Sequence, residues 1–508
     1  MNNIFFWAGF ILWGSIIFIL YLLRSKSRLH NMTLDQSGSF KSRLPLFLTI
    51  SVIMICSLPM GLCPIYNGES PGHRNQYEVM AESILNGHLY MDYDVDPKLL
   101  DMENPYDYEA RLEIGVNHPW DHAYYNGHFY MYFGIVPVFL LFLPWRIITG
   151  VSLTTYHATQ IFAALFIIGV FRLFYFYIKT FFRDMTLAMY LLLSSAFSIM
   201  SIWYSINAPA LYCTANVSGI CVQIWSIYLF SKAVWGECTN INKRIAYAFG
   251  GSLLGALAFG CRPPVAFANL LVIPMLIEFM RGKKLTLRLA GKLIIAASPY
   301  IFIGLLLMSY NYLRFENPFE FGQSYQLTIA DQRDYGSLLK QFDIFKVLNG
   351  LLQNFIYYEP LRREFPYISY NGAFVNFPIL AYGVFLLFLE NTRRALRNVH
   401  LYFFSIVLFI LPLLITTITI LGSPCLIERY RMDIYWLMGI LSFLAIGFYH
   451  SGLSEVMKAK FSHSISVWAF ITVFSCVMLY LVPYDFSLTE YDPAVLETIK
   501  KIFTFGMS

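Results

Sequence analysis

Charged residues are scarce in this sequence. Asp, Glu, Lys and Arg make up only 13% of its 508 residues, whereas about 25% is usual for a soluble domain. Hydrophobic residues make up 57% and aromatic residues 18%. This shortage of charge excludes a soluble globular chain and predicts a polytopic membrane protein.

Two further absences narrow the function. The eight cysteines are scattered, mostly inside apolar runs, and form no CxxC pair, which argues against a disulfide framework or a zinc site. The basic residues form only short clusters beside the hydrophobic runs. Membrane topology explains such clusters, so we expect no nucleic-acid partner.

The first apolar run and the cationic segment after it predict the orientation of the chain in the membrane. Residues 4–23 are long enough to span a bilayer, and no small-residue cleavage site follows before Arg24, which predicts a retained helix. Segment 24–43 is cationic, so the positive-inside rule places it in the cytoplasm. A second span, 44–63, then carries the chain to the outer face.

The later hydrophobic runs predict ten more spans. Run 133–148 contains Pro137 and Pro144, and counting it as non-spanning places all later basic clusters in the cytoplasm. We therefore expect about twelve transmembrane helices in one integrated membrane domain, 1–508, with multiple passes through the plasma membrane. The ten predicted spans are 155–178, 185–206, 210–231, 245–261, 264–280, 289–310, 372–390, 400–421, 432–450 and 465–483.

Two long segments lie on the predicted outer face, 64–132 and 311–371. The first is strongly acidic, with twelve carboxylates against three cations, and it carries five of the ten histidines. Its apolar residues from Tyr77 to Leu85 recur at helical spacing, which predicts a helix lying flat on the bilayer, or alternatively packed within an outer subdomain. Asn126-Gly127 between aromatic residues predicts a β-hairpin. The expected fold is thus all-α and polytopic, with a mixed extracytoplasmic subdomain.

Arginines at the predicted outer ends of helices are candidates for anion binding. They are Arg262, Arg314, Arg429 and Arg431. A charge at this depth is costly without a partner, and a guanidinium group binds phosphate through paired hydrogen bonds. The alternative is that each arginine reaches lipid headgroups or pairs with a carboxylate.

The order of these parts resembles the GT-C superfamily of membrane glycosyltransferases, especially the bacterial branch near the protein O-mannosyltransferases and lipid A aminoarabinose transferase. The shared parts are the large outer segment after an early span, its first helix, and several short motifs over roughly residues 44–440. These motifs are Pro119-Trp120-Asp121, Tyr125-Asn126-Gly127-His128-Phe129-Tyr130, Tyr132-Phe133-Gly134-Ile135-Val136-Pro137, Arg262-Pro263 and Asn317-Pro318-Phe319-Glu320-Phe321-Gly322.

The resemblance implies transfer of a sugar from a polyprenyl-phosphate donor to a glycolipid, glycan or protein acceptor on the outer face, among membrane lipids. Such chemistry needs a carboxylate base and cations for the departing phosphate. The family's Asp-Glu before the first outer helix is replaced here by His73-Arg74-Asn75-Gln76. The candidate bases are therefore Asp121, ranked first, and Glu69, ranked second.

Each candidate base has a structural alternative, since Asp121 could cap a turn and Glu69 could be a solvated loop residue. Glu78 is a further acid in register. The predicted donor-phosphate ligands are Arg262, Arg429 and Arg431, and the predicted substrate contacts are His118, Tyr125, Arg314 and Glu320. Asp94 and Asp96 with nearby histidines could bind a divalent cation, but their spacing is not that of a ligand set, so no metal ligand is assigned.

Three other functions fit parts of the pattern. A polymerase or ligase of lipid-linked glycans would share the outer face, the lipid carrier and the arginines, but would carry its main loops later. A lipid or solute transporter would show mid-span carboxylates and repeat symmetry, which the sequence lacks. A non-catalytic relative would explain the missing Asp-Glu.

Overall fold

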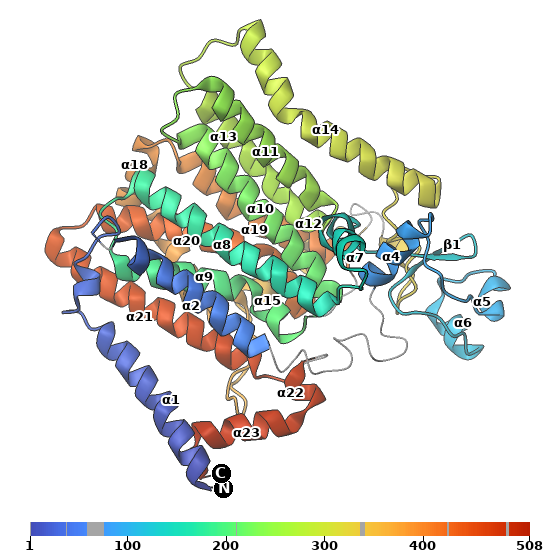
Figure 1. Cartoon of the computed structure of the whole chain (residues 1–508), viewed down its shortest axis with the longest axis horizontal. Coiled ribbons are helices and arrows are strands. Elements are labelled where there is room, and N and C mark those ends of the chain that lie inside the picture. Colours follow the sequence, from blue (N-terminus) through green and yellow to red (C-terminus); the bar gives the residue numbers. More distant parts are fainter. Residues whose placement is uncertain are drawn as a thin grey trace.

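The computed structural model describes residues 2–36, 38–57, 76–209, 211–335, 341–423, 426–483 and 487–507. The chain is an all-α polytopic membrane protein, as predicted, and within these residues nine helices are long and apolar enough to cross a bilayer (Figure 1). They are α1 (Asn2–Leu22), α8 (Thr155–Phe181), α9 (Leu187–Asn207), α10 (Leu211–Trp235), the run α12 (Pro263–Ala266), η4 (Phe267–Leu271) and α13 (Val272–Met280), α14 (Leu287–Phe315), α19 (Tyr402–Gly422), α20 (Met432–Ser451) with the preceding turn η6 (Glu428–Arg431), and α21 (Glu455–Tyr480).

The other three predicted spans are also helical. They are α2 (Gly38–Ser57), α11 (Ile241–Phe259) and α17 (Pro378–Phe388). Helix α17 has only 11 residues, or about 17 Å at 1.5 Å per residue, because the polar helix α18 (Glu390–Asn398) follows it directly. It is therefore shorter than a full bilayer crossing.

The bundle is organised around α20. In the apolar stretch formed by η6 and α20, 94% of the residues are buried, whereas only 6% are buried in the apolar stretch of α1. Helices α8, α9, α10 and α19 supply much of the core around α20. The rings of Phe174 and Phe443 stack there with centroids 3.8 Å apart. Helix α1 instead leaves most of its apolar side chains exposed and packs on α23 (Pro493–Phe503).

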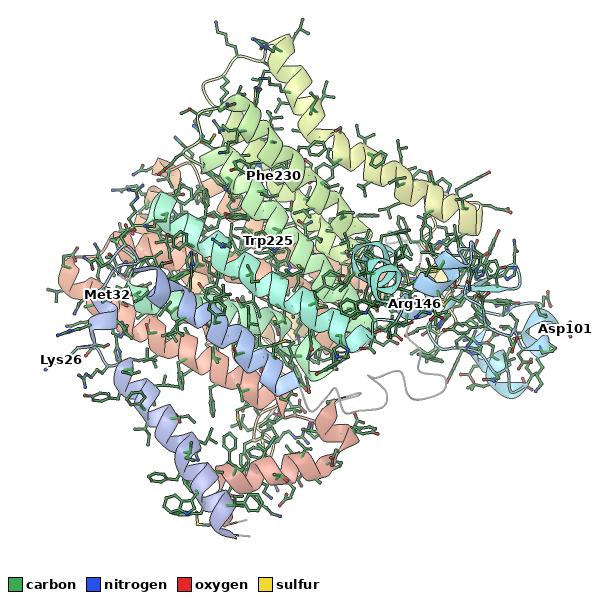
Figure 2. The ribbon with its side chains drawn as sticks, viewed as in Figure 1. Lys26, Met32, Asp101, Arg146, Trp225 and Phe230 are labelled. Atoms are coloured by element: carbon green, nitrogen blue, oxygen red, sulfur yellow. The ribbon has the colours of Figure 1, made fainter. Side chains whose placement is uncertain are left out.

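The cationic and acidic segments lie at opposite ends of the molecule. Figure 2 shows Lys26, in the cationic segment, at one end of the bundle and Asp101, in the acidic segment, at the tip of the other. This arrangement agrees with their predicted placement on opposite sides of the membrane. The run before α8 folds as the π-helical turn η3 (Val138–Phe142) and α7 (Leu143–Thr149), 12 residues in all, or about 18 Å, too short to cross a bilayer.

The acidic segment forms a small subdomain of short helices and one hairpin. The predicted hairpin is present as β1 (Ala123–Tyr125) and β2 (His128–Tyr130), paired antiparallel. Asn126 and Gly127 both have positive φ, 48° and 77°, as a type I′ turn requires. The short helices are α4 (Gln76–Leu85), α5 (Pro97–Leu100) and α6 (Tyr108–Glu113).

Helix α4 matches the predicted helix, but it does not lie with its apolar face toward lipid. Tyr77 and Met80 are fully buried, and the Tyr77 ring stacks on Phe142 of η3. The expectation of a helix lying flat on the bilayer is wrong, because the juxtamembrane run η3–α7 covers its apolar face. The packed alternative describes α4 correctly.

Helix α4 also fixes the start of α8. The carboxylate of Glu78 accepts hydrogen bonds from the backbone N–H of Thr155, at 2.8 Å, and from its hydroxyl, at 3.1 Å. An anionic acceptor at a helix N-terminus satisfies free donors and complements the helix dipole. Glu78 therefore has a structural role, and it is not available as a base.

The second outer segment packs onto the hairpin. Ala123 pairs with Gln326 in an antiparallel bridge, and Tyr124 N–H donates to the Tyr325 carbonyl at 2.9 Å. Residues 325–328 thus lie beside β1. Further along the same segment, α15 (Ile344–Phe355) packs on α19.

Candidate active site

Asp121 lies where α4, the second outer segment and the membrane bundle meet. Its φ of 56° is in the left-handed region, which Asp tolerates better than most residues. Its N–H donates to the Leu327 carbonyl at 3.1 Å, and its own carbonyl accepts from Nε2 of Gln76 at 2.7 Å. Hydrogen bonds therefore hold both the N–H and the carbonyl of Asp121 in place.

The Asp121 carboxylate is 7% exposed and bonded to uncharged donors. The Tyr212 hydroxyl, from the first turn of α10, donates to Oδ2. Gln326 Nε2 donates to Oδ1 at 2.9 Å, and the Thr328 side chain also bonds to the carboxylate. Two segments that are distant in sequence from Asp121, and from each other, thus orient its carboxylate.

Burial raises the pKa of Asp121 above its ordinary value. The hydrogen bond from Tyr212 and the charge of Arg429 act in the opposite direction, because both favour the ionised form, but burial prevails. A buried carboxylate with a raised pKa is a stronger base than an exposed aspartate. Burial with specific partners of this kind is typical of functional sites.

Arg429 lies on the other side of Tyr212. Its guanidinium carbon is 3.7 Å from the centroid of the Tyr212 ring, a cation–π contact. In the described part of the chain, Arg429 has no carboxylate within the 4.0 Å ion-pair limit. A half-buried guanidinium group without an anionic partner is suited to binding an external anion.

Arg262 has a protein partner. Its Nε and Nη2 both bond to the Asp433 carboxylate, at 2.7 Å to Oδ1 and 2.7 Å to Oδ2 respectively. Asp433 is fully buried and also accepts from Nδ2 of Asn216 at 2.7 Å. The ring of Tyr430 lies between the two arginines, 5.5 Å from the Arg262 guanidinium and 5.7 Å from that of Arg429.

Arg431 is also paired. Its guanidinium forms an ion pair with Glu428, and its Nε donates to Oδ1 of Asn354 in α15 at 3.1 Å. Both predicted phosphate ligands other than Arg429 are thus matched to carboxylates. Their role in donor binding stays a prediction.

Gly134, just after the acidic segment, contacts Gly260 in the turn between α11 and α12 that carries Arg262, called here the Arg262 hairpin. A Cβ on Gly134 would lie 2.1 Å from the Gly260 carbonyl oxygen, so the two backbones touch. The Val136 N–H donates to that same carbonyl at 2.9 Å. This contact places Tyr132 close to the arginines, and burial raises the pKa of its hydroxyl to about 12, so it remains a hydrogen-bond donor.

Comparison with solved structures finds an apo crystal structure of the Archaeoglobus fulgidus oligosaccharyltransferase. The TM-score is 0.45 and the sequence identity 12%, over 90% of this chain and 56% of that chain. This chain therefore matches little more than half the length of that enzyme. No family model and no curated protein matches the sequence.

The other predicted substrate contacts have partners within the protein. Arg314 is 4% exposed, and its two terminal nitrogens donate to the Met131 carbonyl and to Asn311 Oδ1, both at 2.8 Å. The Glu320 carboxylate accepts from the Gly322 N–H at 2.6 Å. Both residues shape the loop beside β2, and their contact with substrate stays a prediction.

His118 and Tyr125 contact other residues of the outer segments. His118 Nε2 accepts from Nε of Arg111 at 3.2 Å, and burial lowers the pKa of His118, so it is neutral at pH 7. The Tyr125 ring packs against Tyr325, with centroids 4.6 Å apart. The structure gives neither residue a contact with Asp121, and their predicted role is untested.

Glu69, the second candidate base, lies outside the described residues. Among the residues that are described, no three His, Cys, Asp or Glu side chains converge on a point that could hold a metal ion. Asp96 instead caps α5, where it accepts from the Lys98 N–H at 2.9 Å.

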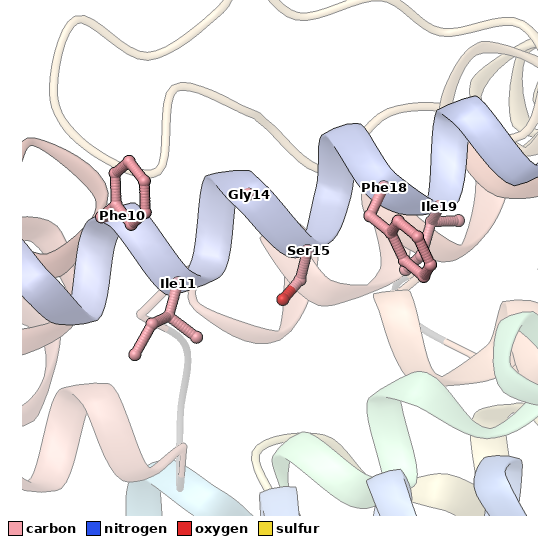
Figure 3. Close-up of a pocket in the computed structure, with 6 residues that line it drawn as sticks. All are labelled: Phe10, Ile11, Gly14, Ser15, Phe18 and Ile19. Atoms are coloured by element: carbon pink, nitrogen blue, oxygen red, sulfur yellow. The ribbon is translucent and has the colours of Figure 1, made fainter.

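A shallow groove of about 400 Å³ runs along one face of α1 (Figure 3). It is apolar apart from Ser15, and it contains none of the predicted site residues. It lies on the exposed helix α1 and not at Asp121. Its lining residues are Phe10, Ile11, Gly14, Ser15, Phe18 and Ile19.

Sequence reasoning missed Tyr212, Gln326 and Asp433. A tyrosine at the outer end of a span resembles an ordinary interfacial aromatic residue, and an isolated glutamine in a loop carries no signal. Asp433 did carry one, because it is an acid in the first turn of an otherwise apolar helix two residues after Arg431. A charge in that position requires a partner.

Proposed function

We propose that this protein is a membrane glycosyltransferase. It transfers a sugar from a polyprenyl-phosphate donor to a hydroxyl of an acceptor on the outer face of the plasma membrane. The observation that carries this proposal is the arrangement about Tyr212, whose hydroxyl bonds to the Asp121 carboxylate and whose ring supports the Arg429 guanidinium. One side chain thus joins a buried base to an unpaired cation.

The reaction needs both groups. The Asp121 carboxylate takes the proton from the acceptor hydroxyl as its oxygen attacks C1 of the donor sugar. The bond from C1 to the phosphate oxygen breaks, and the negative charge that remains on the lipid phosphate is stabilised by Arg429. The burial of Asp121 supports this role because it raises the proton affinity of the carboxylate.

Neighbouring groups complete the site in this proposal. Arg262 and Arg431 hold η6 and α20 in place through Asp433 and Glu428, and a phosphate that displaces either carboxylate recruits them as further ligands. On the acceptor side, Arg314 and Glu320 shape the loop beside the hairpin. His118 and Tyr125 lie on the same subdomain, within reach of a long acceptor. The acceptor is a glycolipid, a glycan or a protein.

The test is transfer by the purified protein in liposomes. A panel of polyprenyl-phosphate sugars, each labelled in the sugar, is offered with membrane glycolipids, and the same sugars linked to nucleotides serve as controls. We expect transfer from at least one lipid-linked donor and from none of the nucleotide donors. Donor binding without transfer across the panel would instead favour a transporter or a non-catalytic relative.

A further inference from the structure

Helix α15 presents three different faces. The first packs on the outer end of α19. A Cβ on Gly350 would lie 2.5 Å from Cδ1 of Ile420, so the helix backbone rests directly on that side chain. On the same face, Asn354 Nδ2 donates to Oγ1 of Thr416 at 2.9 Å.

The second face is apolar and exposed. Phe345 is 79% exposed, Leu348 50%, Leu352 57% and Ile356, just after the helix, 58%. These residues recur at intervals of three or four, so they form one continuous ridge. An exposed apolar patch of this kind marks a site of contact with a membrane, a ligand or another protein.

The third face is polar. Asn349 and Gln353, four residues apart, are exposed and lie beside the ridge, and Lys346 is part-exposed on the same side. A helix with one protein-facing side, one apolar exposed side and one polar exposed side has the pattern of an interfacial helix, with its apolar side in the bilayer and its polar side in water.

The position of α15 agrees with this pattern. Thr416 and Ile420 belong to the last two turns of α19, which ends at Gly422, so they lie within about 9 Å of the outer end of a spanning helix. Interfacial helices bury their apolar face about 5–10 Å into the headgroup and acyl boundary. Tyr357 and Tyr358 follow α15 and are exposed, as in the aromatic belt of membrane proteins.

We propose that α15 inserts its ridge of Phe345, Leu348, Leu352 and Ile356 among the acyl chains of the outer leaflet. The first face of α15, which packs on α19, then holds η6 at the membrane surface, because Asn354 bonds to Arg431 at 3.1 Å. Arg429, two residues away, is thereby placed at the level of lipid phosphates. This second step rests on the proposed function, whereas the insertion of the ridge does not.

The experiment measures depth at single residues and needs no enzyme activity. Single cysteines replace Leu348 or Leu352 on the ridge, and Asn349 or Gln353 on the polar face, in a chain otherwise free of cysteine. Each is labelled with a nitroxide in phosphatidylcholine vesicles. Collision rates with oxygen, which partitions into the bilayer, and with a water-soluble nickel chelate are then measured.

We expect the ratio of oxygen to nickel collisions to be several-fold higher at Leu348 and Leu352 than at Asn349 and Gln353. Equal ratios at the four sites would place the ridge in water and overturn the proposal. Protection of the ridge labels from both reagents would also overturn it, because the cover would then be protein.

A positioning variant separates the two steps. Asn354→Leu keeps the apolar ridge but removes the hydrogen bonds to Arg431 and to Thr416. Because Gly350 still packs on Ile420, we expect an unchanged depth profile and several-fold weaker binding of a polyprenyl-phosphate sugar. Unchanged binding with the same depth profile would overturn the coupling to η6. If the wild-type protein shows the expected depth profile but binds no donor, the proposed function is refuted and the insertion of α15 into the bilayer still stands.

Discussion

The hydroxyl of Tyr212 donates a hydrogen bond to Oδ2 of Asp121, so the first turn of the membrane-spanning helix α10 holds a carboxylate of the outer subdomain. The same tyrosine ring lies 3.7 Å from the guanidinium carbon of Arg429. The two charges most useful for glycosyl transfer thus depend on one uncharged side chain. The predictions below separate its contribution from theirs.

Replacing Tyr212 by Phe removes a hydrogen bond that favours the ionised form of Asp121. The pKa of Asp121, already raised by burial, rises further. Because a base acts only when deprotonated, the limb of the pH–rate profile that rises with pH should move to higher pH. A hydrogen bond to a charged group contributes about 1.5–3 kcal/mol, so the acidic limb should move up by about one to two pH units, and transfer should be lost mainly on that limb.

The control for this change is Tyr90→Phe, on the surface of the same subdomain, where the ring stacks between two histidines and away from Asp121. Its pH profile should match the wild type. An unshifted acidic limb in Tyr212→Phe would show that Asp121 is not the group that titrates.

Arg429→Gln should weaken donor binding. The substitution removes the cation but keeps a hydrogen-bond donor of similar length, and a charge-assisted contact to phosphate is worth about 1.5–3 kcal/mol. The Kd for a polyprenyl-phosphate sugar, measured by calorimetry in nanodiscs, should rise about 10- to 100-fold. Arg333→Gln is the matched control, because Arg333 is exposed and paired with Asp331; a rise of the same size in that variant would reduce the effect to general electrostatics.

The pair Arg262–Asp433 should behave as a buried ion pair. Arg262→Met alone leaves Asp433 charged and without its cation, at a cost of about 3–5 kcal/mol in the free energy of unfolding. Adding Asp433→Leu should restore much of that loss, as thermal unfolding in detergent can measure. If the double variant also binds donor like the wild type, then Arg262 is not a phosphate ligand.

Gly134→Ala should separate the acidic segment from the Arg262 hairpin. The new Cβ would lie 2.1 Å from a backbone oxygen of Gly260, and backbone cannot move aside as a flexible side chain can. We expect a loss of about 1–3 kcal/mol in stability together with loss of transfer. Gly304→Ala, in α14 with open space around its Cβ position, should be near neutral in both assays.

The parts of the fold set by local pattern could be predicted from the sequence. Long apolar runs gave the helices of the bundle, and Asn126-Gly127 gave the hairpin, because only such residues adopt its turn without strain. The side of the membrane on which each loop lies stays a prediction. The helix at Tyr77 was predicted with nearly correct ends. The packing of η3 over its apolar face was not predicted, because nothing in the helix itself indicates that Phe142 stacks on Tyr77.

The site depends on contacts between distant segments, and these are harder to predict. Asp121 was ranked first among the candidate bases from the sequence. Its partners Tyr212 and Gln326, however, lie 91 and 205 positions further along the chain, so they could not be predicted. The three arginines predicted as phosphate ligands were equivalent in sequence. Only the fold distinguishes Arg429 from Arg262 and Arg431, because Asp433 and Glu428 fall beside the other two.

The most direct test of the central claim uses Asp121→Asn, which keeps the shape of the side chain and one acceptor oxygen but replaces the basic oxygen by an amide NH2 group. Single-turnover transfer from a bound polyprenyl-phosphate sugar is measured beside the Kd of that donor. We expect transfer to fall by at least about 100-fold, while the Kd stays within about twofold because Arg429 is intact. Transfer at the wild-type rate, or loss of donor binding together with transfer, would contradict the assignment of Asp121 as the base.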